Sequence, residues 1–283
     1  MKSLRWQVLF VFTMLSAPLL FSGLDGLGES LLLEGRLALF RGENWLVSQQ
    51  LSDGSWGENP IFTSQAGVIL ANANLELYSE RLEKGCQWLR RNAETLSNAE
   101  ALAQAIRLPL RIQHPATTVL VRQLRESKKK WMLDGQPASV RQSLLELYYL
   151  LPRETAILSE NEIVVMQKTL LDDKEQPAFV LLTLLSLGKH PARPEELTSL
   201  LTACMEAAKT AALEDLFWIV RALRGYERVF PETAKDWRAA IVAKLLEKQR
   251  GDGTFAGTTD STALKCMTET CFALLTLQLC LAS

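Results

Sequence analysis

The chain has 283 residues, of which 48% are hydrophobic, so it is long enough to bury a sizeable core. Thirty-one basic residues balance thirty-two acidic ones, and this near-neutral charge argues against nucleic acid as a partner. The one local basic run, Lys128-Lys129-Lys130, is typical of a solvated helix end.

Residues 1–23 have the composition of a targeting segment. Lys2 and Arg5 precede an uncharged, mostly apolar run from Trp6 to Phe21. A secretory signal has a basic start before a short apolar run, and an uncleaved membrane anchor has the same pattern. We therefore expect residues 1–23 to be a signal peptide or an N-terminal membrane anchor. The protein is then secreted, periplasmic or membrane-anchored, and membrane contact would come through this segment.

Apolar residues recur every three to four positions from Glu29 to Gln50, which predicts an amphipathic helix. It leads into the stretch Gln49-Gln50-Leu51-Ser52-Asp53-Gly54-Ser55-Trp56-Gly57. Glutamines at a helix end can hydrogen-bond carbonyls that have no partner inside the helix, and Asp-Gly supplies a turn whose glycine is free to take positive φ. Trp56 can fold back over the helix ends. We predict that this stretch is a clasp between successive helices, carried by Gln49, Gln50, Asp53, Gly54 and Trp56.

Two further helices are expected after this loop. Thr63 or Ser64 is a candidate N-cap for a helix that runs to about Tyr78, and a second helix fits Glu80 to Arg91.

The middle of the chain, from about residue 97 to 235, is rich in leucine and alanine, and β-branched alternation is nearly absent. Proline and glycine, for example Pro109, Pro137 and Gly225, are expected to separate successive helices. Tyr148-Tyr149 and Phe217-Trp218 are expected in the core or lining a cavity. We find no linker or second-domain boundary, so residues 29–283 are predicted to form a single all-α domain.

A degenerate second copy of the clasp lies near the C-terminus, as Gln249-Arg250-Gly251-Asp252-Gly253-Thr254-Phe255-Ala256-Gly257. Its structural residues are Gln249, Asp252, Gly253 and Phe255. Copies of one helix-ending loop near both ends of the chain suggest a helical repeat fold that closes on itself.

Both loops resemble the QW repeat of squalene-hopene cyclases and related prenyltransferase-like proteins, in which a glutamine is followed by a short spacer, a glycine, any residue and a tryptophan. The resemblance covers roughly a third of the chain. It implies an α/α toroid, a ring of inner and outer helices, with a site at the centre or mouth of the ring.

The resemblance also suggests one catalytic candidate, Asp260. Squalene-hopene cyclases protonate an alkene with the middle aspartate of an Asp-x-Asp-Asp motif followed by Thr-Ala. Thr258-Thr259-Asp260-Ser261-Thr262-Ala263 has a similar frame, in which Asp260 matches the acid while Thr258 and Ser261 replace its carboxylate neighbours. The competing interpretation is that Asp260 and Ser261 are N-cap residues of a helix starting near Thr262.

No metal or cofactor site is predicted. The protein prenyltransferases hold zinc with an aspartate, a cysteine and a histidine, but in Glu269-Thr270-Cys271 a glutamate stands where the histidine would be. The chain has only two histidines, His114 and His190, each beside a proline. Its five cysteines are interpreted as apolar core residues: Cys86, Cys204, Cys266, Cys271 and Cys280.

The leading hypothesis is an exported or membrane-anchored α/α toroid that acts as a non-catalytic binding or scaffold domain. Its ligand would be an isoprenoid-like or other apolar small molecule, or a protein segment. The alternative is an enzyme, either a divergent terpene cyclase that uses Asp260 as proton donor or a lyase or hydrolase on the same scaffold.

Overall fold

A computed structural model of the protein describes residues 27–96, 98–128, 136–151, 157–173, 176–186, 194–230, 237–255 and 262–282. These residues form α-helices joined by loops, with one isolated antiparallel bridge between Gln50 and Trp56. The chain divides into two compact units, Met1–Gly42 with Gln167–Ser283, and Glu43–Met166. The boundaries between the units fall within α2 (Glu29–Gln49) and α9 (Glu160–Asp172).

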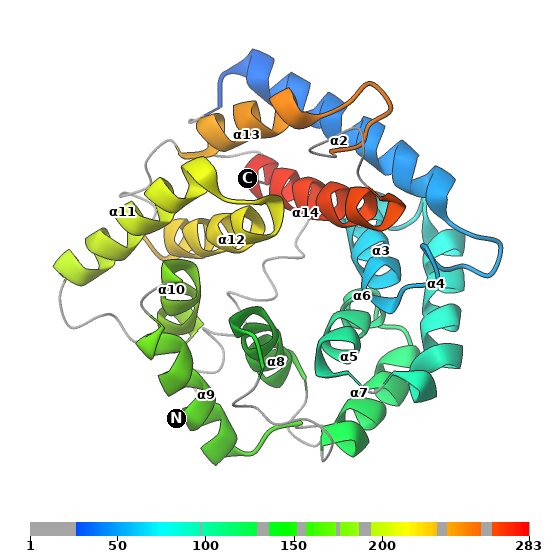
Figure 1. The fold of residues 1–283 in the computed structure, drawn as a ribbon. Helices are drawn as coiled ribbons and strands as arrows, with labels where there is room; N and C mark the ends of the chain where they lie inside the picture. Colours follow the sequence, from blue (N-terminus) through cyan, green and yellow to red (C-terminus); the bar gives the residue numbers. More distant parts are fainter. Residues whose placement is uncertain are drawn as a thin grey trace. The chain divides into compact units, whose positions relative to one another are not determined.

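The unit Glu43–Met166 contains two rows of helices. The first row is α3 (Pro60–Asn74), α5 (Ala99–Ala105) with the short α6 (Arg107–Arg111), and α8 (Ala138–Leu150), each packed on the next. In the second row, α4 (Ser79–Asn92) packs on α3 and on α7 (Ala116–Ser127), and α7 packs on α5 (Figure 1). A 3-10 turn, η2 (Ala93–Thr95), follows α4.

The other unit repeats this plan. Its first row is α10 (Pro177–Ser186), α12 (Leu213–Val229) and α14 (Ala263–Leu281), with α12 packed on both neighbours. In the second row, α11 (Pro194–Thr210) packs on α10 and α12, and α13 (Trp237–Lys248) packs on α14 (Figure 1). Leucine and alanine fill the interfaces, and ten side chains of α14 are buried.

By length and composition α14 is apolar enough to cross a membrane, and 56% of that apolar stretch is buried inside the protein. Its contacts with α12 and α13 account for this burial. We therefore interpret α14 as a core helix of its unit.

The start of α3 differs from the sequence expectation. Its N-cap is Asn59, whose side chain accepts hydrogen bonds from the backbone N–H groups of Ile61 and Phe62, and Pro60 occupies the first turn. Thr63 and Ser64 were the predicted caps, but both lie inside the helix and are buried. The helix also ends earlier than predicted, at Asn74.

Two other predicted boundaries also differ. Gly225 lies within α12 rather than between helices, and a Cβ added there would lie 3.1 Å from Leu185 of α10. The glycine therefore allows α10 and α12 to pack closely. At α14 the N-cap is Thr262, whose hydroxyl accepts from the Lys265 N–H at 3.3 Å. The helices predicted over Glu29 to Gln50 and Glu80 to Arg91 are confirmed as α2 and α4.

The loop that follows α2, called here the first clasp (residues 49–57), fastens the end of α2 to α4. Gln50 Nε2 donates to the Gly54 carbonyl at 3.0 Å and to the Arg81 carbonyl of α4 at 2.9 Å. Gln49 takes no part in this pair of bonds and donates to Ser48 Oγ. The glutamine therefore links the loop to the neighbouring helix rather than capping its own.

The last carbonyls of α2 have other partners in the first clasp. Trp56 is fully buried, and its indole Nε1 donates to the Leu46 carbonyl at 2.7 Å. Arg81 Nη1 donates to the Val47 carbonyl at 3.2 Å. These two side chains thus satisfy carbonyl groups that a helix end leaves without intrahelical partners.

The loop that follows α13, called here the second clasp (residues 249–255), has the same geometry. Gln249 Nε2 donates to the carbonyls of Gly253 and of Ala38 in α2. Asp252 Oδ1 accepts from the Thr254 N–H and hydroxyl, as Asp53 Oδ1 does from Ser55. The second clasp therefore seats on α2 as the first clasp seats on α4.

A threonine hydroxyl holds the aromatic residue of each clasp. The Trp56 N–H donates to Thr63 Oγ1 at 3.0 Å, and the Phe255 N–H donates to Thr270 Oγ1 at 3.1 Å. Phe255 is as fully buried as Trp56 but has no ring N–H, so the second clasp has no counterpart of the indole hydrogen bond.

One glycine in each clasp is in the left-handed region and lies against a helix carbonyl. Gly54 has φ 96° and Gly253 has φ 92°. A Cβ at Gly54 would lie 2.5 Å from the Lys84 carbonyl oxygen, and one at Gly253 would lie 2.5 Å from that of Arg41. Only glycine fits both the backbone conformation and this close approach.

We expect Gly253→Ala to destabilise the protein by about 2–4 kcal/mol, because it combines a strained φ with a clash against backbone. Gly251→Ala is the matched control, since a Cβ at Gly251 meets nothing within 4 Å and the change should stay within about 0.5 kcal/mol. Chemical denaturation of the two variants beside wild type measures both effects. Equal stability of the two variants would contradict the account of the second clasp.

Candidate functional site

The structure places eight of the nine predicted motif residues in the two clasps, and the ninth, Gln49, is exposed beside the first clasp. The catalytic candidate Asp260 lies outside the described residues. Because Thr262 is the N-cap of α14, that cap does not require Asp260 or Ser261. The region is therefore best approached through the groups that the structure describes around α10, α12 and α14.

Four aromatic side chains meet where these helices pack, and we call them the aromatic cluster: Phe179, Phe217, Trp218 and Phe272. Phe217 contacts Trp218 with ring centroids 5.2 Å apart and Phe272 at 5.7 Å, and Phe179 lies 5.2 Å from Trp218. All four are buried. They come from three different helices, so their proximity could not be predicted from spacing along the chain.

A guanidinium group already lies on the aromatic cluster. The Arg221 Cζ is 5.8 Å from the Phe217 ring centroid and 5.5 Å from that of Trp218. Ring faces attract cations electrostatically. In this structure that attraction acts on a fixed side chain.

The carboxylate of Glu227 joins α12 to α13. Arg224 Nη1 donates to it at 2.7 Å and Arg238 Nη2 at 2.5 Å. Burial alone would raise the pKa of Glu227, but the hydrogen bonds from Arg238 and Arg224 outweigh it and hold the pKa below its usual range. Arg224 also donates to the Ala282 carbonyl, so the pair fastens the end of α14.

Glu146 is, among the described residues, the one carboxylate in the fully buried class, with 3% of its surface exposed. Arg107 Nη2 donates to it at 3.0 Å and also to the Ser143 hydroxyl. Gln142 Nε2 lies 3.4 Å from its other oxygen. This network connects α6 to α8 and meets the requirement that a buried charge be paired.

Glu43 is a partly buried carboxyl group near the end of α2, and burial raises its pKa from 4.5 to about 7. The pKa of the neighbouring Tyr78 is raised by its own burial and by the charge of Glu43. A proton on Glu43 is thus retained near neutral pH, and nothing in the sequence pattern distinguishes this glutamate from the exposed ones of the same helix.

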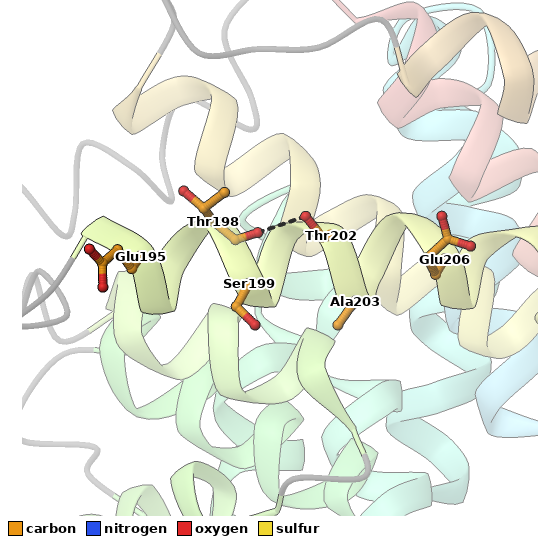
Figure 2. Close-up of a pocket in the computed structure, with 6 residues that line it drawn as sticks. All are labelled: Glu195, Thr198, Ser199, Thr202, Ala203 and Glu206. Carbon is orange, nitrogen blue, oxygen red and sulfur yellow. Dashed lines mark hydrogen bonds between the residues drawn. The ribbon is translucent and has the colours of Figure 1, made fainter.

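An open hollow follows the exposed face of α11, and Figure 2 shows the six side chains that line it: Glu195, Thr198, Ser199, Thr202, Ala203 and Glu206. Thr202 Oγ1 donates to the Thr198 carbonyl of its own helix at 2.9 Å. The lining is largely polar and comes from one helix. It therefore lacks the apolar enclosure that a small hydrophobic ligand needs.

Within the described residues, histidine, cysteine, aspartate and glutamate do not form groups of three or more that could hold a metal ion. The five cysteines are free thiols, and all but Cys266 are buried. Burial raises the pKa of the Cys86 and Cys204 thiols to about 12, which makes both unreactive near neutral pH.

The raised pKa of Glu43 predicts a pH-dependent stability. The folded chain holds this proton more tightly than the unfolded chain does, so stability falls as pH rises from about 4.5 to about 7. Glu43→Gln should remove that fall and stabilise the protein at pH 8 by about 1–2 kcal/mol, a value reduced for the partial exposure of the group. Denaturation at pH 4, 6 and 8 checks this, since the two proteins should differ least at pH 4. A difference that does not change with pH would contradict the assignment.

The chain matches no protein-family model and no curated protein sequence. Among solved structures it resembles a variant of the type II terpene cyclase MstE from Scytonema in complex with its substrate, geranylgeranyl dihydroxybenzoate, with a TM-score of 0.63 and 11% identity over 89% of this chain and 99% of that one. A second MstE variant, in complex with the product merosterolic acid A, gives a TM-score of 0.62 and 12% identity over 89% of this chain and 98% of that one. The predicted fold class is thereby confirmed: the chain is all-α and has the α/α toroid fold of the type II terpene cyclases.

Proposed function

We propose that the protein is an exported or membrane-anchored α/α toroid that binds an apolar, isoprenoid-like ligand without transforming it. Residues 29–283 form the binding domain in this proposal, and residues 1–23 form the leader or anchor. The choice of ligand rests on the shared fold, because a solved neighbour holds a geranylgeranyl compound. A protein segment is the other ligand considered.

The observation that carries the non-catalytic part of the proposal is the pairing of the buried carboxylates. Protonation of an alkene needs a carboxylic acid that is protonated, strongly acidic and open to an apolar pocket. Glu146 is paired with Arg107, and Glu227 with Arg224 and Arg238. Each of these carboxylates accepts its hydrogen bonds from cations and has no role as a donor.

The raised pKa of Glu43 does not supply the missing acid. Burial keeps its proton in place by making the ionised form less stable, and the same effect makes the group a weaker acid. Asp260 remains the candidate donor for the alternative cyclase function, without the flanking carboxylates that the cyclase motif has at the positions of Thr258 and Ser261.

Arg221 supports the same conclusion. A cyclase would use free aromatic faces to stabilise a cationic intermediate, whereas Phe217 and Trp218 both face the guanidinium group of Arg221. A toroid that only binds its ligand has no need of free aromatic faces.

The full chain and an Asp260→Asn variant, purified side by side in detergent, would test the proposal. We expect organic extracts of both to contain the same apolar molecule in stoichiometric amount, identified by mass spectrometry, and heat-denatured samples washed before extraction to contain none. Both proteins should also bind added geranylgeranyl dihydroxybenzoate and return it unchanged.

Two results would overturn this proposal in different ways. A cyclised product made by the wild type and not by Asp260→Asn would establish the cyclase alternative. Empty extracts from both proteins, with no binding of the added compound and the fold intact by circular dichroism, would instead favour a protein ligand.

A further inference from the structure

The exposed side of α2 carries three large apolar side chains. Leu33, Leu37 and Phe40 have 57%, 48% and 58% of their surface exposed. Their spacing of four and three residues places them in one stripe on the helix, which we call the α2 stripe. Arg36 and Arg41 are also exposed, one on each side of the stripe.

The opposite side of α2 is apolar too. Ala38 and Leu46 are buried, a Cβ at Gly35 would contact Leu281 of α14, and one at Gly42 would overlap Leu274 of α14. A helix that is apolar on both sides is normally covered on both. A second apolar environment is therefore expected to cover the α2 stripe.

The sequence before α2 indicates what this environment is. Nineteen residues, 6–24, contain no charged side chain, and in helical form they would span about 28 Å, close to the thickness of a bilayer core. Only four residues, 25–28, separate this run from Glu29, where α2 begins, so α2 starts within about 14 Å of the run even when these residues are fully extended.

We infer that α2 lies along the surface of a lipid bilayer, with Leu33, Leu37 and Phe40 among the acyl chains and Arg36 and Arg41 directed to the headgroups. An apolar stripe flanked by long basic side chains is the pattern of an interfacial helix. Three half-exposed side chains do not hold a protein on a membrane alone, so the uncharged run is the anchor and the α2 stripe fixes the orientation of the unit.

The uncharged run is a poor candidate for covering the stripe itself. If it lay on α2 as a helix, its own outer side would be as apolar as the stripe that it covers, and the problem would be moved to a new surface. In a bilayer both the run and the stripe have an apolar environment.

This inference rests on the membrane-anchored form of the proposed function and does not depend on ligand binding. Its test uses the full chain in a Cys266→Ser background, because Cys266 is the one native thiol outside the buried class. Bimane is attached at Leu37→Cys, and separately at Ala203→Cys as a matched control on the exposed face of α11 in the same unit. Each protein is reconstituted into phosphatidylcholine vesicles with plain or brominated acyl chains.

Bromine on the acyl chains should lower the fluorescence at position 37 about twofold and leave position 203 nearly unchanged, since bromine quenches only probes at acyl-chain depth. A second labelled variant, Phe40→Cys, should behave as Leu37→Cys does, and it replaces that variant if Leu37→Cys fails to fold.

Equal quenching at positions 37 and 203, or none at 37 in protein that floats with the vesicles, would overturn the inference. A blue-shifted probe at position 37 without quenching would show that a second copy of the chain covers the stripe. Protein that does not float because its leader has been removed would overturn the inference as well. None of these results depends on whether an isoprenoid is bound, so they leave the ligand-binding proposal to its own test.

Discussion

The architecture depends on one constraint, the approach of a left-handed glycine to the carbonyl row of a neighbouring helix. In both clasps the glutamine donates to one carbonyl of the receiving helix, and the glycine lies against the carbonyl three residues further on: Arg81 and Lys84 for the first clasp, Ala38 and Arg41 for the second. Carbonyls three residues apart lie on one side of a helix, so each loop is fixed by two points on a single face. A side chain at the glycine would lift the loop away from that face and break the glutamine hydrogen bond.

The clasps also solve the problem of helix ends in an all-helical protein. The last carbonyls of a helix have no intrahelical partner, and burying them costs free energy unless a donor is supplied. At the end of α2 the donors are the Trp56 indole and the Arg81 guanidinium, so the aromatic residue of the motif both fills space and donates a hydrogen bond. Phe255 keeps only the first role, which explains how the second copy can be degenerate in sequence and still have the same backbone geometry.

Local chemistry determined what could be predicted from the sequence. The clasp residues, the helices α2 and α4 and the all-α fold class depend on turn residues, apolar period and helix propensity, all of which act over short stretches. The start of α3 was misplaced because Thr63 is used by tertiary structure: its hydroxyl accepts from the Trp56 N–H, and Asn59 supplies the cap. The equivalent acceptor in the second clasp, Thr270, is fifteen residues from Phe255 rather than seven, so no fixed spacing reveals either. The aromatic cluster and the arginine–carboxylate pairs join residues of different helices and required the structure.

Acid strength separates a toroid that binds an isoprenoid from one that cyclises it. A buried carboxyl group can be kept protonated by removing water from it, as at Glu43, but desolvation stabilises the proton on the group and makes its transfer to an alkene harder. A strong acid that is still protonated needs neighbours that stabilise the carboxylate left after the transfer, and the cyclase motif has carboxylates beside its acid where this chain has Thr258 and Ser261. The buried carboxylates Glu146 and Glu227 have the opposite arrangement, cations that stabilise the charge and leave no proton to give. A scaffold with both kinds of carboxyl group is suited to holding an apolar molecule and poorly suited to protonating one.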